Sequence, residues 1–140
     1  MAYKAFLDIN ILVDFIDKGR KEHSNAVLLF KAIAERRVTG YISESVVNTA
    51  YYLTQKLISL PQFVLFINDT LQILKVLPCT NAIITGASAI AKNDFEDAVL
   101  YQIALSNQLN FFITNDTKNY RKIAHPALKI VSAKELITLL

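Results

Sequence analysis

Short runs of apolar residues alternate along the chain with longer stretches in which apolar positions recur every three or four residues. Each short run stops at a polar or turn residue, which is typical of buried strands, and the longer stretches have the period of amphipathic helices. The pattern predicts strands over 3–7, 39–43, 76–78, 110–114 and 128–131, the third of them brief at best. It predicts helices over 10–18, 24–37, 44–57, 61–74, 80–92 and 93–108, and a last helix from 132 onward.

Polar residues stand at several of the expected helix starts. Asn10 is placed to cap the first helix through its side-chain oxygen. The pairs Asn93–Glu96 and Ser132–Glu135 have the spacing of capping boxes, in which two side chains satisfy each other's backbone N–H groups. We therefore expect Glu96 to be a capping residue.

Strands that alternate with helices predict an α/β fold, in which helices cover both faces of a parallel sheet. Right-handed crossovers then bring the carboxyl ends of all strands to one edge, where such sheets bind their ligands. The length of 140 residues suits one domain over 1–140.

Composition narrows the class of protein. Apolar residues make up 53% of the chain and charged residues 19%, which excludes a disordered chain. Mean hydropathy is high at +0.32. No apolar run approaches the roughly 18 residues of a membrane span, so we expect no membrane association. The surplus of apolar residues favours a sheet buried on both faces, or a homodimer interface.

Few residues are available for thiol or imidazole chemistry. The single cysteine, Cys79, excludes an internal disulfide and a zinc knuckle, and two histidines leave little for histidine-based metal binding. The apolar segment between Lys4 and Asp8 is shorter than the roughly 7–15 residues of a signal peptide, so we expect a cytoplasmic protein. The net charge of +3 permits a polyanionic partner.

Four aspartates fall where a ligand site is expected. Asp8 ends the first strand and Asp116 follows the fourth, while Asp94 and Asp97 share one face of the first turn of the preceding helix. If the first and fourth strands are neighbours, these carboxylates converge and repel one another. A divalent cation relieves that repulsion, and oxygen ligands select Mg²⁺ or Mn²⁺. Such a site predicts metal-assisted phosphodiester hydrolysis.

Each aspartate also has a purely structural interpretation. Asp8 could end its strand in an Asx turn, and Asp116 could be an ordinary turn residue. Asp94 and Asp97 could favour a helix start through the helix dipole. We expect the remaining helical aspartates to lie on solvated faces: Asp14, Asp17 and Asp69.

Three segments, in order, resemble the motifs of the PIN domain family of VapC-like toxin ribonucleases, in the subgroup with an Asp-Phe-Glu-Asp segment. Residues 6–10, Phe-Leu-Asp-Ile-Asn, look like its opening apolar-Asp-Thr/Ser-Asn motif. Residues 94–98 read Asp-Phe-Glu-Asp-Ala, and residues 113–116, Ile-Thr-Asn-Asp, resemble its Thr-Arg-Asp element. Tyr120 stands where an aromatic residue usually follows, and the motifs cover nearly the whole chain.

This resemblance implies a three-layer α/β/α sandwich with a short central parallel sheet. It also implies a Mg²⁺- or Mn²⁺-dependent ribonuclease, often the toxin of a toxin–antitoxin pair. By the same resemblance, the residues would be catalytic metal ligands (Asp8, Asp97, Asp116), supporting polar groups (Asn10, Thr114) and one outer group or extra ligand (Asp94).

The chain departs from the family pattern at two positions. The family usually has a glutamate in the helix after the second strand, and here that position holds Thr49. Ile9 stands where the family prefers a small hydroxyl residue. Thr49 supplies no negative charge, so the alternative is a degenerate PIN domain that binds RNA or a protein without cleavage. A Mg²⁺-dependent phosphatase or a receiver module is a third alternative, but the second aspartate of the phosphatase pattern is here Asn10.

Basic and aromatic residues indicate possible partners. Lys118, Arg121 and Lys122 follow Asp116 closely and are placed to hold an RNA backbone. We expect the cluster 18–21 to be solvated surface. An antitoxin protein could cover the metal edge. A homodimer could form through apolar residues of two helices: Tyr51, Tyr52, Leu53 and the segment 63–74.

Overall fold

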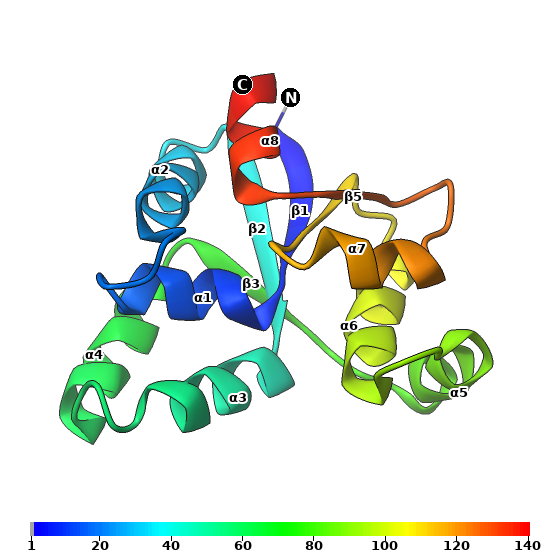
Figure 1. The fold of residues 1–140 in the computed structure, drawn as a ribbon, viewed down its shortest axis with the longest axis horizontal. Helices are drawn as coiled ribbons and strands as arrows, with labels where there is room; N and C mark the ends of the chain where they lie inside the picture. The colour runs from blue at the N-terminus through cyan, green and yellow to red at the C-terminus, as the bar shows by residue number, and fades with distance from the viewer. Residues whose placement is uncertain (1) are drawn as a thin grey trace.

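A five-stranded parallel sheet forms the centre of the structure, a computed structural model that describes residues 2–140 (Figure 1). The strand order is β3-β2-β1-β4-β5, so the first and fourth strands are neighbours. The strands are β1 (Tyr3–Leu7), β2 (Val38–Ser43), β3 (Leu74–Leu77), β4 (Phe111–Ile113) and β5 (Lys129–Val131). The predicted α/β class is confirmed, and all four strand pairs are parallel.

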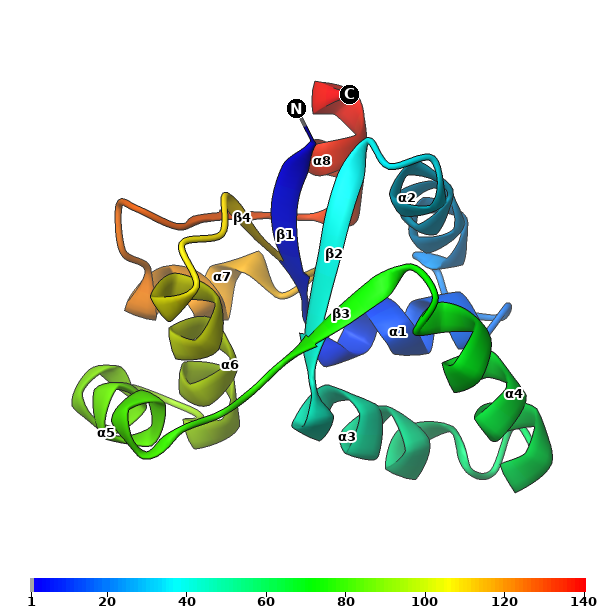
Figure 2. The same ribbon diagram turned by 180° about the vertical axis from the view of Figure 1, so that it is seen from behind.

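The helices form two groups on opposite sides of the sheet (Figures 1 and 2). One group contains α1 (Ile9–Ile16), α2 (His23–Ala34), α3 (Glu44–Thr54), α4 (Leu60–Thr70) and α8 (Ala133–Leu139). The other contains α5 (Asn81–Ile90), α6 (Phe95–Ser106), α7 (Thr117–Tyr120) and a 3₁₀ turn at Arg121–Ile123. The last two were not predicted, because four-residue helices carry no periodic signal.

Two predicted helix caps are wrong by one or two residues. Asp8, and not Asn10, caps α1: its backbone is extended and its side chain accepts a hydrogen bond from Ile9 N. Asp94, and not Asn93, caps α6, where its Oδ1 accepts from the backbone N of Asp97. In both cases an aspartate directly before the first helical residue is the cap. The capping box at Ser132 is confirmed.

The core lies on both faces of β1 and β4. Phe6 and Phe112 stack at 5.5 Å between ring centroids, and both are fully buried. Gly40 of β2 lets its neighbours approach the sheet, because an added Cβ would lie 2.5 Å from Leu74 Cδ2 and 3.0 Å from Ile33 Cδ1. This packing fixes the relative positions of β1, β2 and β3. Within residues 2–140, none of the helices combines the length and the apolarity needed to cross a bilayer.

Candidate active site

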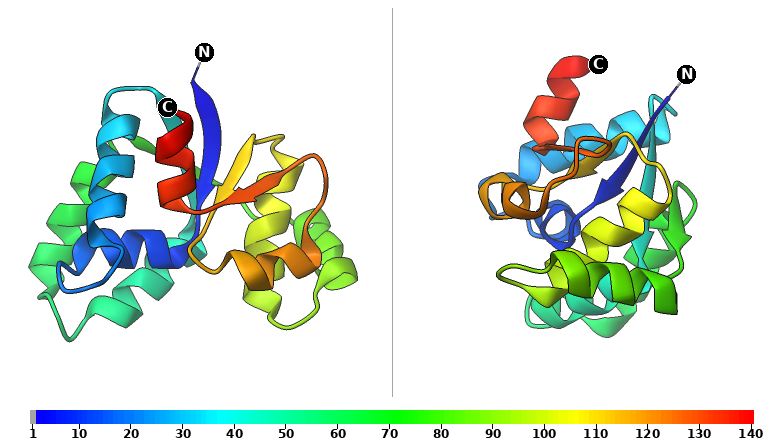
Figure 3. Two further views of the ribbon diagram at one scale, coloured as in Figure 1. Left: turned by 45° about the horizontal axis from the view of Figure 1, so that its top comes forward. Right: turned by 90° about the vertical axis from the view of Figure 1, so that its right-hand side faces the viewer.

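Residues from three distant parts of the chain meet at the carboxyl edge of β1 and β4. Asp8 follows β1, and Thr114 follows β4, whose register places Leu7 opposite Ile113. In Figure 3, left, the segment that contains α7 lies beside the junction of β1 with α1 and near α6. The pairing of β1 with β4 therefore brings Asp8 and Thr114 together at this edge.

Asp8 is the most enclosed of the acidic residues at this edge, with 4% of its surface exposed. Its Oδ1 accepts from Ile9 N at 2.8 Å, and its Oδ2 accepts from Thr114 Oγ1 at 2.8 Å. The same Thr114 hydroxyl accepts from the backbone N of Asp116 at 3.0 Å. Thr114 thus positions two of the expected metal ligands with one side chain.

Tyr120 joins Asp8 to Asp97. Its hydroxyl lies 3.1 Å from Asp8 Oδ1 and 2.9 Å from Asp97 Oδ1, and the side chain is buried. A phenol has one proton and can donate to only one carboxylate at a time. The sequence marked Tyr120 only as an aromatic position, and nothing in it indicated that this hydroxyl bridges two carboxylates.

Asp116 and Asp94 lie around the same hollow as Asp97. Asp116 Oδ2 accepts from Asn119 Nδ2 at 3.0 Å, and Asp94 is exposed. The hollow has a volume of about 280 Å³. Its lining consists of Lys92, Asn93, Asp94, Asp97, Asp116, Asn119 and Ile123. We call it the acidic hollow. Lys92 is its one basic lining residue, and the sequence analysis did not single it out.

The environment of these carboxylates disfavours their charge. Burial raises the pKa of Asp8 above its usual value, although the hydrogen bonds from Thr114 and Ile9 N act in the opposite direction. Burial raises the pKa of Asp97 to about 6, and the nearby carboxylates of Asp94, Asp8 and Asp116 add to the effect. The pKa of Tyr120 is also raised, first by burial and then by the two carboxylates beside it. These groups form one electrostatically coupled cluster.

The donor chemistry suits a hard divalent cation, since every acidic group here offers oxygen. Neither of the two ion pairs found within residues 2–140 neutralises Asp8, Asp97 or Asp116. Within those residues, no three histidine, cysteine or acidic side chains are already grouped closely enough to hold a metal ion. The exposed and half-buried aspartates would therefore have to turn toward Asp8 when a cation binds.

Thr49 does not reach Asp8. Its Oγ1 donates to Glu96 Oε2 at 3.2 Å, which links α3 to the first turn of α6. Glu96 is therefore not the reciprocal capping residue expected from the sequence, because Asp94 caps the helix and leaves the Glu96 side chain free to turn toward α3.

The predicted RNA-binding residues are exposed on α7 and the 3₁₀ turn, but none of them lines the acidic hollow: Lys118, Arg121 and Lys122. Asn10 lies beside a second hollow, which also contains Asp116. Asp14 lies in that hollow too, and the prediction that it is solvated is wrong, because it is 3% exposed. Its burial depends on Asn115, whose Nδ2 donates to it from 101 residues away.

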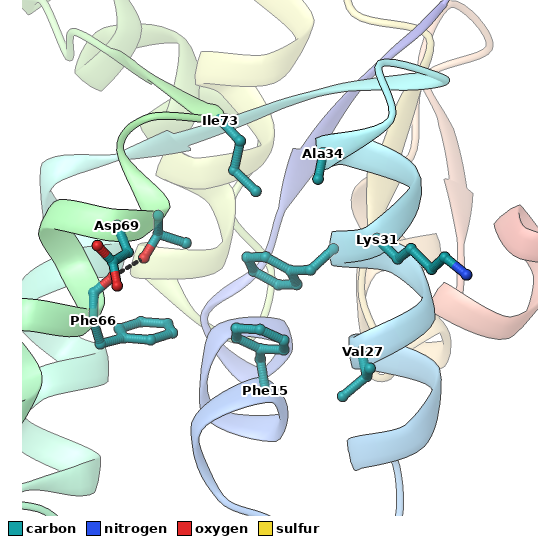
Figure 4. A pocket seen from close by; sticks show the side chains of 9 residues that line it. Phe15, Val27, Lys31, Ala34, Phe66, Asp69 and Ile73 are labelled. Atoms are coloured by element: carbon teal, nitrogen blue, oxygen red, sulfur yellow. Dashed lines mark hydrogen bonds between the residues drawn. The ribbon is translucent and has the colours of Figure 1, made fainter.

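An apolar groove lies apart from these carboxylates, between α1, α2 and α4 (Figure 4). Its volume is about 410 Å³. The rings of Phe15 and Phe30 stack at 4.1 Å on its floor, and Phe66 closes one side. The groove contains one carboxylate, Asp69, and so offers no set of metal ligands.

Comparison with known proteins finds similarity to the PIN domain, to a ribonuclease and to structures of toxins. The sequence model of the PIN domain matches residues 4–118. Ribonuclease VapC1 of Aquifex aeolicus is 23% identical over 137 residues, covering 94% of this chain and 92% of that protein. A toxin–antitoxin complex from Klebsiella pneumoniae has a TM-score of 0.67 at 20% identity, covering 92% of this chain and 97% of that chain. VapC20 of Mycobacterium tuberculosis, a toxin that cleaves the sarcin–ricin loop, has a TM-score of 0.62 at 14% identity, covering 77% and 86%.

Proposed function

Because the chain belongs to the PIN domain family, we propose that it is an endoribonuclease that hydrolyses RNA phosphodiester bonds with Mg²⁺ or Mn²⁺, and that it acts as the toxin of a toxin–antitoxin pair. The observation that carries the proposal is the meeting of Asp8 and Asp97 at one Tyr120 hydroxyl. These carboxylates come from β1 and α6, far apart in sequence, and no cationic side chain pairs with them within residues 2–140.

The raised pKa values indicate that the carboxylates at this edge lack a positively charged partner. Asp8 and Asp97 are less acidic than free aspartates because they are buried near other carboxylates. Carboxylates whose pKa is raised in this way cluster at functional sites. A divalent cation would stabilise the ionised forms and relieve the repulsion.

The residues divide into ligands and positioning groups. Asp8, Asp97 and Asp116 would hold the cation, which when bound would supply positive charge to the phosphate and acidify a water molecule. Thr114 orients Asp8 and the backbone of Asp116. Asp94 holds the backbone of Asp97 through its capping hydrogen bond.

Residues outside the acidic hollow would serve the RNA. Asn10 stands beside Asp116 in the second hollow and would support the site as a polar group. Lys118, Arg121 and Lys122 are exposed, directly after Asp116, and are available to RNA phosphates.

An antitoxin protein is the second partner that we propose. The similar structure from Klebsiella pneumoniae is a toxin–antitoxin complex. This chain has an apolar groove between α1, α2 and α4, whose lining includes Val27, exposed by 40%, and contiguous apolar surface is typical of protein contacts. If a small protein is encoded next to this chain, co-expression with it tests the pairing: co-purification and inhibited cleavage are expected, and unaffected cleavage would argue against it.

The nuclease activity is tested with purified protein and single-stranded RNA in Mg²⁺, in Mn²⁺ and in excess EDTA. We expect cleavage only with metal, and a loss of at least about 100-fold on Asp97→Asn, since outer-shell changes alone often reach that size. Asp69→Asn removes a carboxylate on α4 and is the matched control. Cleavage that survives in EDTA, or in the Asp97→Asn variant, would contradict the assignment.

A PIN domain that binds without cleaving is the second candidate, and Thr49 favours it. Its hydroxyl donates to Glu96, and Thr49 supplies no negative charge for a cation. Calorimetry with Mn²⁺ separates the two candidates. Binding that Asp97→Asn abolishes supports the nuclease, whereas absence of binding at millimolar Mn²⁺ supports the non-cleaving domain.

A further inference from the structure

A second hollow shares Asp116 with the acidic hollow, and its lining contains both acidic and basic side chains. Its volume is about 290 Å³, and Asp116 belongs to both hollows. Its lining consists of Asn10, Asp14, Arg20, Lys21, Glu22, Asn115 and Asp116. The two hollows therefore meet at Asp116.

The loop between α1 and α2 is held in place at this hollow. Asp14, which is 3% exposed, accepts from Arg20 Nε at 2.6 Å through Oδ1 and from Asn115 Nδ2 at 2.7 Å through Oδ2. His23 Nδ1 lies 2.8 Å from the backbone O of Asp14. These contacts attach the loop to α1 and to the residue that follows Thr114. Arg20 is exposed, as expected for the cluster 18–21, and in addition it pairs with Asp14.

Two cationic side chains remain available at this hollow. Arg20 uses Nε for Asp14, and within residues 2–140 its two terminal nitrogens make no hydrogen bond. Lys21 is exposed, and its ammonium has no carboxylate partner within the same residues. The charge of Asp14 is matched by Arg20, while Glu22 accepts from Asn25 Nδ2 at 2.8 Å. The free donors are therefore the Arg20 fork and Lys21.

We propose that this hollow is a phosphodiester-binding subsite, in which Lys21 and Arg20 hold a backbone phosphate of the RNA strand whose cleaved phosphate lies at the acidic hollow. The inference rests on the proposed function. It extends that function by giving the RNA strand a path over the surface, from the acidic hollow across Asp116 to the loop between α1 and α2. A guanidinium fork and an ammonium are the side-chain groups that bind phosphate most directly. A single nucleic-acid strand is the ligand that spans both hollows, because successive phosphates follow one another along it.

Lys21→Gln is the variant that tests the subsite cleanly. Replacing Arg20 would leave the buried Asp14 carboxylate without its cation and would destabilise the fold. Lys4→Gln is the matched control, since Lys4 is exposed in the first half of β1, at the far end of the strand from Asp8. Lys21→Arg keeps the charge and should keep the binding.

Binding is measured by fluorescence anisotropy with a labelled single-stranded RNA of about 12 nucleotides, with Ca²⁺ in place of Mg²⁺ to limit cleavage. We expect Lys21→Gln to bind several-fold more weakly and to lower the slope of log K against log[salt] by about 0.7, the value of one phosphate contact on a single strand. Lys4→Gln and Lys21→Arg should leave the slope unchanged.

Cleavage of the same RNA by the wild-type protein in Mg²⁺ is measured in parallel. If the wild type cleaves but Lys21→Gln binds with the wild-type slope, the subsite is wrong and the nuclease proposal stands. If the wild type binds without cleaving and Lys21→Gln lowers the slope, the subsite is supported and the protein is a PIN domain that binds RNA without cleaving it. Absence of RNA binding by the wild type overturns the subsite, and absence of cleavage as well overturns both.

Discussion

Asp8 combines a structural role with the proposed chemical role. It caps α1 through Ile9 N and presents its other oxygen to Thr114. Because an asparagine oxygen can also cap a helix, Asp8→Asn separates the two roles. We expect Asp8→Asn to abolish cleavage with little change in melting temperature.

Asp8→Ala provides the comparison. This variant loses the cap, which costs about 1 kcal/mol of stability. It also removes the carboxylate that accepts from Thr114 and leaves Tyr120 with Asp97 as its acceptor. Thermal denaturation of both variants, with cleavage measured on the same preparations, checks the prediction. An Asp8→Asn protein that cleaves RNA at the wild-type rate would remove Asp8 from the chemistry.

The stability of the metal-free protein should depend on pH through Asp97. The pKa of Asp97 is about 6 in the folded protein, above its ordinary value of 3.8. The folded state therefore holds the proton more tightly, so stability from this group is present below pH about 4 and is lost as the pH rises through 6. Asp8 acts in the same direction.

Thermal denaturation in EDTA, from pH about 4 to about 7, measures this effect as the difference between wild type and Asp97→Asn. The wild type should lose stability relative to the variant as the pH rises. Asp69→Asn, which changes an exposed carboxylate, should leave the pH dependence as it is in the wild type. A wild type that gains stability relative to Asp97→Asn over this range would contradict the raised pKa.

At the residue scale, the sequence predicted where the aspartates fall but not how they are connected. Asp8 and Asp116 were identifiable because each follows a strand of a parallel sheet, and such strands end at one edge. The bridge through Tyr120 was not, because it depends on a four-residue helix. The burial of Asp14 was missed because its partner Asn115 is 101 residues away.

At the element scale, the helix α4 ends earlier than its apolar periodicity predicts, because the residues after it pair with a strand of the sheet. The apolar pattern predicts a helix to Leu74, but α4 ends at Thr70, whose hydroxyl bonds back to Phe66 O. Leu74 instead begins β3 and pairs with Gly40 of β2. The parallel partner that selects a strand here lies more than 30 residues away, so a local pattern cannot reveal it.

Gly40→Ala tests how closely the side chains of Leu74 and Ile33 pack against β2 at Gly40. The added methyl group would overlap Leu74 Cδ2 and press on Ile33 Cδ1, and overpacking of this kind costs about 1–3 kcal/mol. Gly19→Ala is the matched control, because its Cβ would meet only Asp17 Oδ1, at 3.3 Å. Urea denaturation should give a lower midpoint for Gly40→Ala alone. Equal midpoints for the two variants would contradict the packing described for β2.

At the scale of the whole molecule, the homodimer stays a prediction. The side chains of Tyr52 and Leu53 on α3 are exposed by 70% and 49%, and Leu65 on α4 by 64%. Light scattering at micromolar concentration should give the mass of two chains, and Tyr52→Asp should give the mass of one, because a buried charge disfavours the interface. A monomeric wild type would remove the proposal.

We propose that Asp8, Asp97 and Asp116 together hold one divalent cation. The most direct measurement is a crystal structure with Mn²⁺, read through its anomalous signal. We expect one peak between Asp8, Asp97 and Asp116, with their carboxylate oxygens about 2 Å from the metal. No peak at millimolar Mn²⁺, or a peak away from Asp8, would contradict it.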